Sequence, residues 1–158
     1  MLKIENIYKT FNAGTINEKH AIKNLSFHLN PHDFVTVIGG NGAGKSTLLN
    51  IVSGAYTTDS GKIVLADNDV TRWPEHKRAA LIGRVFQDPM MGTAANMAIE
   101  ENLAMAQRRG KTRGLGWGLT PKERNLYKEK LQMLDLGLET RMKSKVGLLS
   151  GGQRQALT

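Results

Sequence analysis

The segment Gly39–Thr47 constrains the fold of this 158-residue chain more than any other feature. Its letters, GGNGAGKST, hold the spacing GxxxxGKS, which is the pattern of a loop that wraps phosphate groups at a strand-to-helix turn. An apolar run at residues 34–38 precedes the loop, and a helical pattern at residues 45–52 follows it. The sequence therefore predicts an α/β core with this loop between a strand and a helix.

The chemistry of the loop defines a candidate site for ATP and Mg²⁺. Its glycines allow backbone conformations in which successive N–H groups point at one phosphate, and the following helix directs its positive end to the same place. Lys45 is predicted to reach the β- and γ-phosphates, and the Ser46 hydroxyl is predicted to ligate Mg²⁺. The predicted loop residues are Gly39, Gly40, Asn41, Gly42, Ala43, Gly44, Lys45, Ser46 and Thr47.

Composition excludes some kinds of site and predicts the cellular compartment of the protein. The chain has no cysteine, so disulfides and cysteine-based zinc sites are excluded. It has no signal-peptide pattern and no apolar run of about 18 residues, so we expect a soluble, cytoplasmic chain. The formal charge of +8 is concentrated in residues 101–158, which hold 12 Lys and Arg against 5 Asp and Glu. This excess favours a solvated helical face over a nucleic-acid surface, because no aromatic residues interleave the charges as stacking platforms.

Periodicity divides the chain into a β-rich part and a helical part. Strands are predicted at residues 2–5, 25–29 and 62–66, with core strands at 34–38 and 82–87. Pro74 opens a short predicted helix, residues 95–106 have a helical composition, and Thr120 with Glu123 forms a capping box. Residues 110–118 hold four glycines and predict a loop. The predicted domains are residues 1–87, a β subdomain with the phosphate-loop core, and residues 88–158, a helical subdomain.

A second glycine motif, LSGGQ at Leu149–Gln153, stands downstream of the loop, and the sequence VFQDP lies between them at Val85–Pro89. In this order and spacing, the three motifs make the chain resemble the nucleotide-binding subunit of ATP-binding-cassette (ABC) transporters. They are similar to the Walker A, Q-loop and signature motifs of that family. The resemblance implies an α/β P-loop NTPase (RecA-like) core with an antiparallel β subdomain and a helical subdomain.

The resemblance also implies roles for residues outside the phosphate loop. Phe11 falls where the family places an aromatic residue that stacks on adenine, and Gln87 matches the glutamine that senses Mg²⁺ and the γ-phosphate. The implied metal ligands are therefore Ser46 and Gln87. In the family, the signature of one subunit closes over the nucleotide held by a second copy in a head-to-tail dimer. Its residues here are Ser150, Gly151, Gly152 and Gln153. The residues themselves equally predict that Ser150 N-caps the final helix.

The family pattern continues beyond the signature, to a Walker B strand with a catalytic glutamate and to a switch histidine. None of the four histidines, His20, His28, His32 and His76, lies downstream of the signature. The resemblance therefore implies an ABC-type ATPase in the intact protein, whereas residues 1–158 lack the C-terminal part of the core and are expected to be inactive. Missing central strands are expected to expose an apolar sheet edge.

The leading interpretation is the ATP-binding motor subunit of an ABC transporter. Residues 88–102 and 148–158 are similar to bacterial solute importers, including uptake systems for amino acids. The implied partners are transmembrane permease subunits and a second nucleotide-binding subunit, at the cytoplasmic face of the cell membrane, and no specific nucleic acid is expected. Met90 and Met91 are predicted to be at least partly exposed, as an adaptable apolar contact for the membrane partner.

Two other classes of protein are alternatives to the transporter interpretation. A soluble ABC ATPase acting on nucleic acid or the ribosome is the alternative, and the basic second part of the chain would serve it. The coiled-coil DNA-repair type is excluded, because no long heptad run separates Gln87 from Ser150. A P-loop kinase or GTPase does not explain the motif at Leu149–Gln153.

Overall fold

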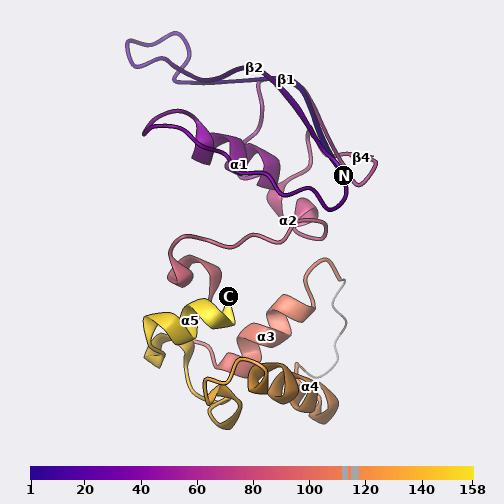
Figure 1. Ribbon diagram of the computed structural model, residues 1–158, viewed down its shortest axis with the longest axis vertical. Coiled ribbons are helices and arrows are strands. Elements are labelled where there is room, and N and C mark those ends of the chain that lie inside the picture. Colours follow the sequence, from indigo (N-terminus) through magenta and orange to yellow (C-terminus); the bar gives the residue numbers. More distant parts are fainter. Residues whose placement is uncertain (112–113, 115–117) are drawn as a thin grey trace. The chain divides into compact units, whose positions relative to one another are not determined.

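The structure, a computed structural model, describes residues 1–111, 114 and 118–158. The loop predicted at residues 110–118 falls partly outside these described residues. The chain divides into two compact units, Met1–Ile82 and Gly83–Thr158 (Figure 1). The functional boundary predicted after residue 87 stays a prediction. Among the described residues, no helix is long and apolar enough to cross a membrane.

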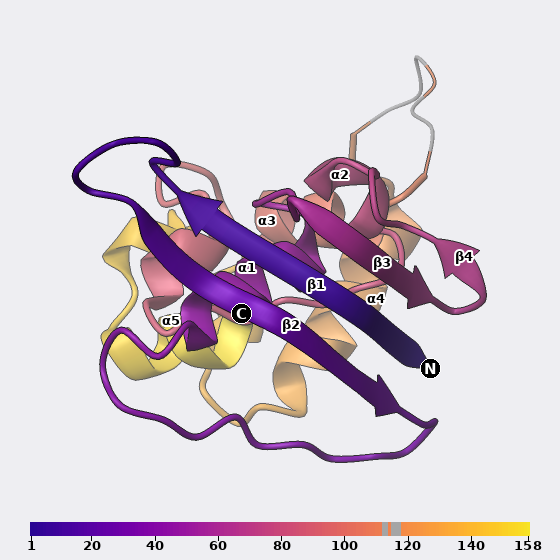
Figure 2. The ribbon, with the colours of Figure 1, turned by 90° about the horizontal axis from the view of Figure 1, so that it is seen from above.

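The first unit is built on a four-stranded antiparallel sheet with the strand order β2-β1-β3-β4 (Figure 2). The strands are β1 Leu2–Phe11, β2 Lys19–Leu29, β3 Ser60–Leu65 and β4 Asn68–Asp69. In β1, Leu2 and Ile4 are buried and Lys3 is exposed, because successive side chains point to opposite faces. The β structure predicted at residues 2–5 and 25–29 is confirmed within β1 and β2. The strand predicted at residues 62–66 is confirmed as far as Leu65, where β3 ends.

Helix α1, Lys45–Ser53, packs against the apolar face of this sheet (Figure 1). Leu48 and Ile51 of the helix are both buried, because residues three apart lie on one helix face. The core of the unit consists of Leu2, Ile4, Ile7, Ile22, Leu48, Ile51, Ile63 and Val70. The helix predicted at residues 45–52 is confirmed.

A buried arginine holds the C-terminal end of α1. Arg78 is the last residue of the short helix α2, Glu75–Arg78, and is 1% exposed. Its guanidinium donates to four backbone carbonyls, those of Ile51 (2.6 Å), Val52 (3.0 Å), Trp73 (3.1 Å) and Thr71 (3.1 Å). Burial lowers the pKa of Arg78, but an arginine side chain stays protonated in proteins. The charge therefore binds carbonyls at the C-terminal end of α1 and on the segment before α2.

Two predicted core strands are not formed, which corrects the sequence prediction. Residues 34–38 and 82–87 have no strand structure. A strand requires a hydrogen-bonded neighbour, and no strand among the described residues pairs with either segment. Phe34 is 94% exposed, Ile38 is 89% exposed and Val85 is 74% exposed. The sequence predicts an exposed apolar sheet edge. The apolar side chains of these two segments are exposed, but the segments are not strands.

The second unit is helical. Its elements are η1 Pro89–Gly92, α3 Ile99–Gln107, α4 Pro121–Gln132, η2 Leu138–Thr140, η3 Val146–Leu148 and α5 Gly151–Leu157. Its core consists of Ile99, Leu131, Leu138, Val146 and Leu149. The capping box predicted before α4 is confirmed. The Thr120 hydroxyl accepts from the Glu123 N–H at 3.3 Å, and the Glu123 carboxylate accepts from the Thr120 N–H at 2.8 Å.

Helix α3 begins four residues later than predicted, at Ile99 instead of residue 95. The preceding residues pair with a later segment. The Gly147 N–H donates to the Ala95 carbonyl at 2.8 Å, and the Val146 N–H donates to the Met97 carbonyl at 3.0 Å. Because these two carbonyls accept hydrogen bonds from residues 146 and 147, they are not available to a helix, and α3 begins only after them.

Candidate nucleotide-binding site

The phosphate loop turns sharply at two glycines. Gly42 and Gly44 have φ angles of +81° and +90°, in the left-handed region that favours glycine. A Cβ atom at Gly44 would also lie 2.6 Å from the Ala21 carbonyl oxygen on β2. The Leu48 N–H donates to the Gly44 carbonyl at 2.8 Å, so α1 begins directly after the turn. Glycine is therefore required at position 44 by backbone conformation and by the close approach of β2.

Lys45, the first residue of α1, folds back over the loop that precedes it. Its Nζ donates to the Gly39 carbonyl at 2.6 Å and to the Gly40 carbonyl at 2.8 Å. An ammonium group has three N–H donors, so one donor remains for another acceptor. These two bonds fix a positive charge on the loop itself.

The first turn of α1 adds further groups that attract anions. The first N–H groups of a helix have no acceptor within it, and they carry the positive end of the helix dipole. Ser46 is exposed on this turn, and Thr47 is half-buried. The described residues contain no cluster of three or more His, Asp or Glu side chains that could hold a metal ion. A cation at the loop would therefore have the Ser46 hydroxyl as its nearby protein ligand and would depend on oxygens of a bound anion.

Phe11 ends β1 and is half-buried beside a second aromatic residue. Its ring centroid lies 5.5 Å from that of Tyr56, at an interplanar angle of 76°. The Lys9 Nζ lies 5.6 Å from the centroid of the Phe11 ring, and the Asp59 carboxylate binds that ammonium at 2.8 Å. The Lys9 hydrogen bond, assisted by the Thr10 N–H at 2.6 Å, lowers the pKa of Asp59. These contacts hold the orientation of the Phe11 ring.

Tyr56 is a site residue that the sequence analysis missed. It follows α1 and is 41% exposed, next to the predicted adenine-stacking residue. No motif marks it, because its proximity to Phe11 depends on how α1 packs on the sheet. No motif marks the nearby residues of β2 either. Lys19 is the strand partner of Phe11, and the Ala21 carbonyl lies close to Gly44. The first unit thus brings Phe11 and the phosphate loop to the same strand, β2.

Gln87 and the signature motif lie in the second unit. Gln87 is exposed and immediately precedes η1. Ser150 is the N-cap of α5: its hydroxyl accepts from the Gln153 N–H at 3.3 Å, and the Gln153 side-chain oxygen accepts from the Ser150 N–H at 3.3 Å. The predicted N-cap role of Ser150 is confirmed.

The two glycines of the signature motif face open space. A Cβ atom added at Gly151 or Gly152 would meet nothing within 4 Å. Neither residue has a positive φ angle, so neither is required by backbone conformation. Packing among the described residues therefore does not require glycine at either position. Close approach of a group outside the chain would require it.

The methionines of η1 are exposed, as predicted from the sequence. Met90 is 49% exposed and Met91 is 68% exposed. The Arg154 guanidinium on α5 contacts the Met90 sulfur and donates to the carbonyls of Gly147 (3.1 Å) and Leu149 (3.2 Å). The Met90 backbone N–H is bonded by the Asp88 carboxylate at 2.8 Å, which caps η1. This surface is thus a capped, ordered turn with apolar side chains pointing outward.

Comparison with known proteins supports the family that the sequence motifs indicate. Residues 22–158 match the family model described as ABC transporter. The chain is 42% identical over 158 residues to the tyrosine transport ATP-binding protein of Clostridioides difficile, covering all of this chain and 62% of that protein. It is 33% identical over 155 residues to a spermidine/putrescine import ATP-binding protein of Shigella dysenteriae serotype 1, covering 98% of this chain and 36% of that protein.

Solved structures show the same fold. A dimeric ATP-binding cassette in a post-hydrolysis state, bound to ADP and Pi, has a TM-score of 0.76 and 27% identity, over 99% of this chain and 66% of that chain. A nucleotide-free cassette from an ABC transporter has a TM-score of 0.70 and 29% identity, over 99% of this chain and 64% of that chain. The chain therefore spans less than two thirds of the length of these relatives.

A glycine-rich loop that leads into a helix, packed on an antiparallel sheet and followed by a helical unit, defines an α/β P-loop nucleotide-binding protein. The fold class predicted from the sequence is confirmed. The family match over residues 22–158 makes the assignment specific: the chain belongs to the ABC transporter family.

Proposed function

We propose that the intact protein is the ATP-binding and ATP-hydrolysing subunit of a membrane transporter, in which ATP binding closes two subunits and hydrolysis releases them. The observation that carries this proposal is the Lys45 ammonium, held on a glycine loop at the start of a helix. A cation, backbone N–H groups and a helix N-terminus at one point form an anion site that suits phosphate groups. Membership of the ABC family favours ATP as the ligand.

Within this site, Lys45 binds the β- and γ-phosphates and the backbone of residues 39–44 surrounds them. Ser46 is the proposed protein ligand of Mg²⁺. This ion prefers oxygen ligands and commonly takes most of them from phosphates and water, which suits a site where the described residues hold no cluster of acidic or histidine ligands. Phe11 stacks on adenine, with Tyr56 beside it. Gln87 is proposed to sense Mg²⁺ and the γ-phosphate from the start of the helical unit.

The signature residues Ser150, Gly151, Gly152 and Gln153 are proposed to contact nucleotide on a second copy of the subunit. Open space around Gly151 and Gly152 supports this role, because a small residue is needed only if an external group approaches the backbone. Dimeric cassettes among the solved relatives also support a paired arrangement. Both glycines changed to alanine should therefore reduce ATP hydrolysis and dimerisation while leaving thermal stability unchanged.

The proposed transport substrate is an amino acid taken up by a bacterial importer. The 42% identity to the protein named for tyrosine transport favours this class over polyamines or macrolides, whose relatives here are less similar. The proposed partners are transmembrane permease subunits, with the protein bound at the cytoplasmic face of the membrane. Uptake of radiolabelled tyrosine by cells with and without the intact system tests this proposal, and equal uptake in both would contradict it.

A nucleotide titration of the intact protein tests the site. Lys45→Ala should abolish measurable ATP binding, because the substitution removes the cation that binds the β- and γ-phosphates. Lys77→Ala, which removes an exposed charge from α2, is the matched control and should bind normally. Unchanged affinity in Lys45→Ala would remove this lysine from its role.

Residues 1–158 alone are proposed to have no steady ATP turnover, since they hold no residue matched to the catalytic glutamate or the switch histidine of the family. Phosphate release can be measured on this purified segment, on its Lys45→Ala variant and on the intact protein. Turnover by the segment that depends on Lys45 would show that the catalytic groups lie elsewhere in it.

A further inference from the structure

A second lysine lies at the phosphate loop. A Cβ atom built at Gly42 would have a single heavy atom within 4 Å among the described residues, the Lys19 Nζ at 3.7 Å. Lys19 is the first residue of β2 and is exposed. Gly42 is one of the two sharp turns of the loop. The ammonium group therefore stands directly beside the backbone that the loop presents to an anion.

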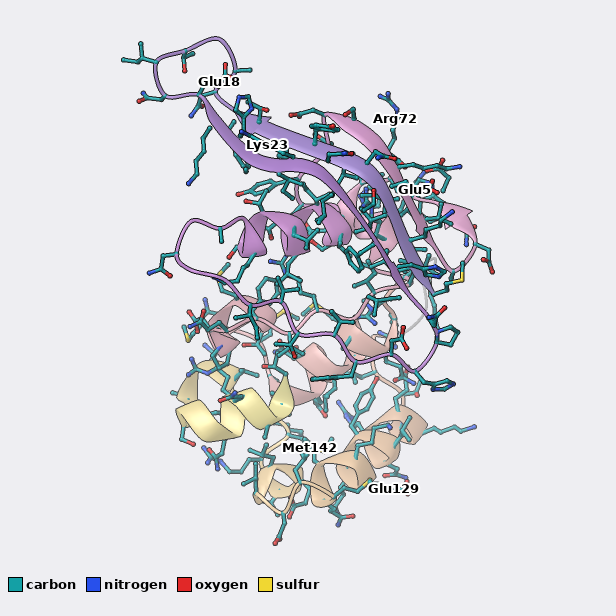
Figure 3. The ribbon with its side chains drawn as sticks, turned by 45° about the horizontal axis from the view of Figure 1, so that its top comes forward. Glu5, Glu18, Lys23, Arg72, Glu129 and Met142 are labelled. Carbon is teal, nitrogen blue, oxygen red and sulfur yellow. The ribbon has the colours of Figure 1, made fainter. Side chains whose placement is uncertain are left out.

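The charge of Lys19 is not used by the fold. Its neighbour Glu18, at the hairpin end of β2 (Figure 3), is bonded by the His20 ring at 3.2 Å and by the Gly14 N–H at 2.7 Å. Within the described part of the chain, the Lys19 ammonium forms no ion pair or hydrogen bond. Lys9 differs, because Asp59 holds it at 2.8 Å. A cation placed by a regular strand and left without an acid is available to a ligand.

The register of the sheet places Lys19 between the two ends of the proposed nucleotide site. Its Cα pairs with that of Phe11, the proposed adenine-stacking residue. Its Nζ reaches the loop at Gly42, and two residues further along β2 the Ala21 carbonyl approaches Gly44. A nucleotide extended from Phe11 to the loop would therefore pass the Lys19 side chain at its phosphate chain.

We propose that Lys19 is a second phosphate-binding cation, which contacts the phosphate chain of a nucleoside di- or triphosphate together with Lys45. This inference rests on the proposed nucleotide-binding function. An anion between the two ammonium groups relieves their mutual repulsion and pairs both. Because Lys19 is exposed, its contribution is modest and is screened by salt.

Equilibrium binding of ATP and of inorganic tripolyphosphate to the intact protein tests the inference. At low salt, Lys19→Gln should weaken both ligands by about two- to fivefold, the range of an exposed ion pair. Lys19→Arg keeps the charge and should bind like the wild type. Lys77→Gln removes an exposed charge from α2, where solvent screens it, and should have no effect. In salt of about 1 M, where the screening length is about 3 Å, the deficit of Lys19→Gln should disappear.

Three results would overturn the inference. Lys19→Gln could behave like Lys77→Gln, or it could weaken ATP while leaving tripolyphosphate unchanged, which would mean a contact with base or ribose. A lower melting temperature in Lys19→Gln would show that the lysine serves the fold. Loss of binding in Lys45→Ala with normal binding in Lys19→Gln refutes this inference alone. Absence of nucleotide binding by the wild type refutes the proposed function as well.

Discussion

Among the side chains of the first unit, Arg78 is predicted to cause the largest loss of stability when it is replaced. It is 1% exposed and donates to four carbonyls, two of them, Ile51 and Val52, at the end of α1. Arg78→Met keeps most of the apolar stem and removes every donor. The variant therefore isolates the hydrogen bonds from the packing volume.

The magnitude follows from the carbonyls left behind. A buried polar group without a partner costs about 1–3 kcal/mol. The Ile51 carbonyl keeps the Gly54 N–H as a partner, so the other three carbonyls set an upper bound of roughly 3–9 kcal/mol. Relaxation of the helix end toward water reduces this sum, and the neutral side chain no longer has to be desolvated as a charge. Within this bound we expect a loss of about 3–5 kcal/mol for Arg78→Met, because three carbonyls lose a charge-assisted hydrogen bond. It is a large share of the roughly 5–15 kcal/mol of a whole domain.

Urea unfolding of the intact protein measures the loss. Trp73 lies in the first unit and reports on it when every tryptophan outside that unit, Trp117 among them, is changed to Phe. Lys77→Met places the same new side chain on exposed α2 and should change the free energy of unfolding by less than about 0.5 kcal/mol. Arg78→Lys keeps the charge with fewer donors and should fall between the two. A loss below about 1 kcal/mol in Arg78→Met would refute the reasoning.

Gly61→Ala should lower the free energy of unfolding by at least about 2 kcal/mol, because φ is +93° and a Cβ would lie 2.5 Å from backbone oxygens of β1; an unchanged urea midpoint would contradict this. The Lys9 contact lowers the pKa of Asp59, so the carboxylate stabilises the fold above its unfolded pKa of about 3.9, and this contribution is lost as pH falls through the lower folded pKa. Asp59→Asn should thus melt below the wild type at pH 7 and match it under strong acid, whereas a gap that persists in acid would point to another cause. Changing Met90 and Met91 together to Ser should weaken co-purification with the membrane partner and spare ATP binding; retained assembly with a lower melting temperature would mean that these methionines serve the fold instead.

Features that depend on adjacent residues could be predicted from the sequence. The capping pairs at Thr120 and Ser150 each need residues three positions apart, and both formed as expected. The phosphate loop is likewise contiguous, so its glycines, its lysine and the helix after it were predictable. The exposure of Met90 and Met91, predicted from a segment of methionines and small residues suited to an adaptable apolar contact, is confirmed.

Features that depend on distant partners could not be predicted. Residues 34–38 have the composition of a buried strand, but composition does not supply a neighbouring strand. Helix α3 lost its first predicted turn to bonds with residues near Val146. Tyr56 and Lys19 joined the candidate site through helix packing and strand register. Arg78 had no signal at all, since a buried arginine that bonds only carbonyls leaves no charge pattern in the sequence.

The buried arginine also acts at a distance. Helix α1 has nine residues and, at 1.5 Å per residue, places its two ends about 13 Å apart. With a dielectric constant of about 20, a unit positive charge at one end attracts a unit negative charge at the other by roughly 1 kcal/mol. Arg78 therefore adds its own long-range field to that of Lys45 for any anion at the loop. A neutral side chain at position 78 would lower affinity for such an anion even in molecules that remain folded.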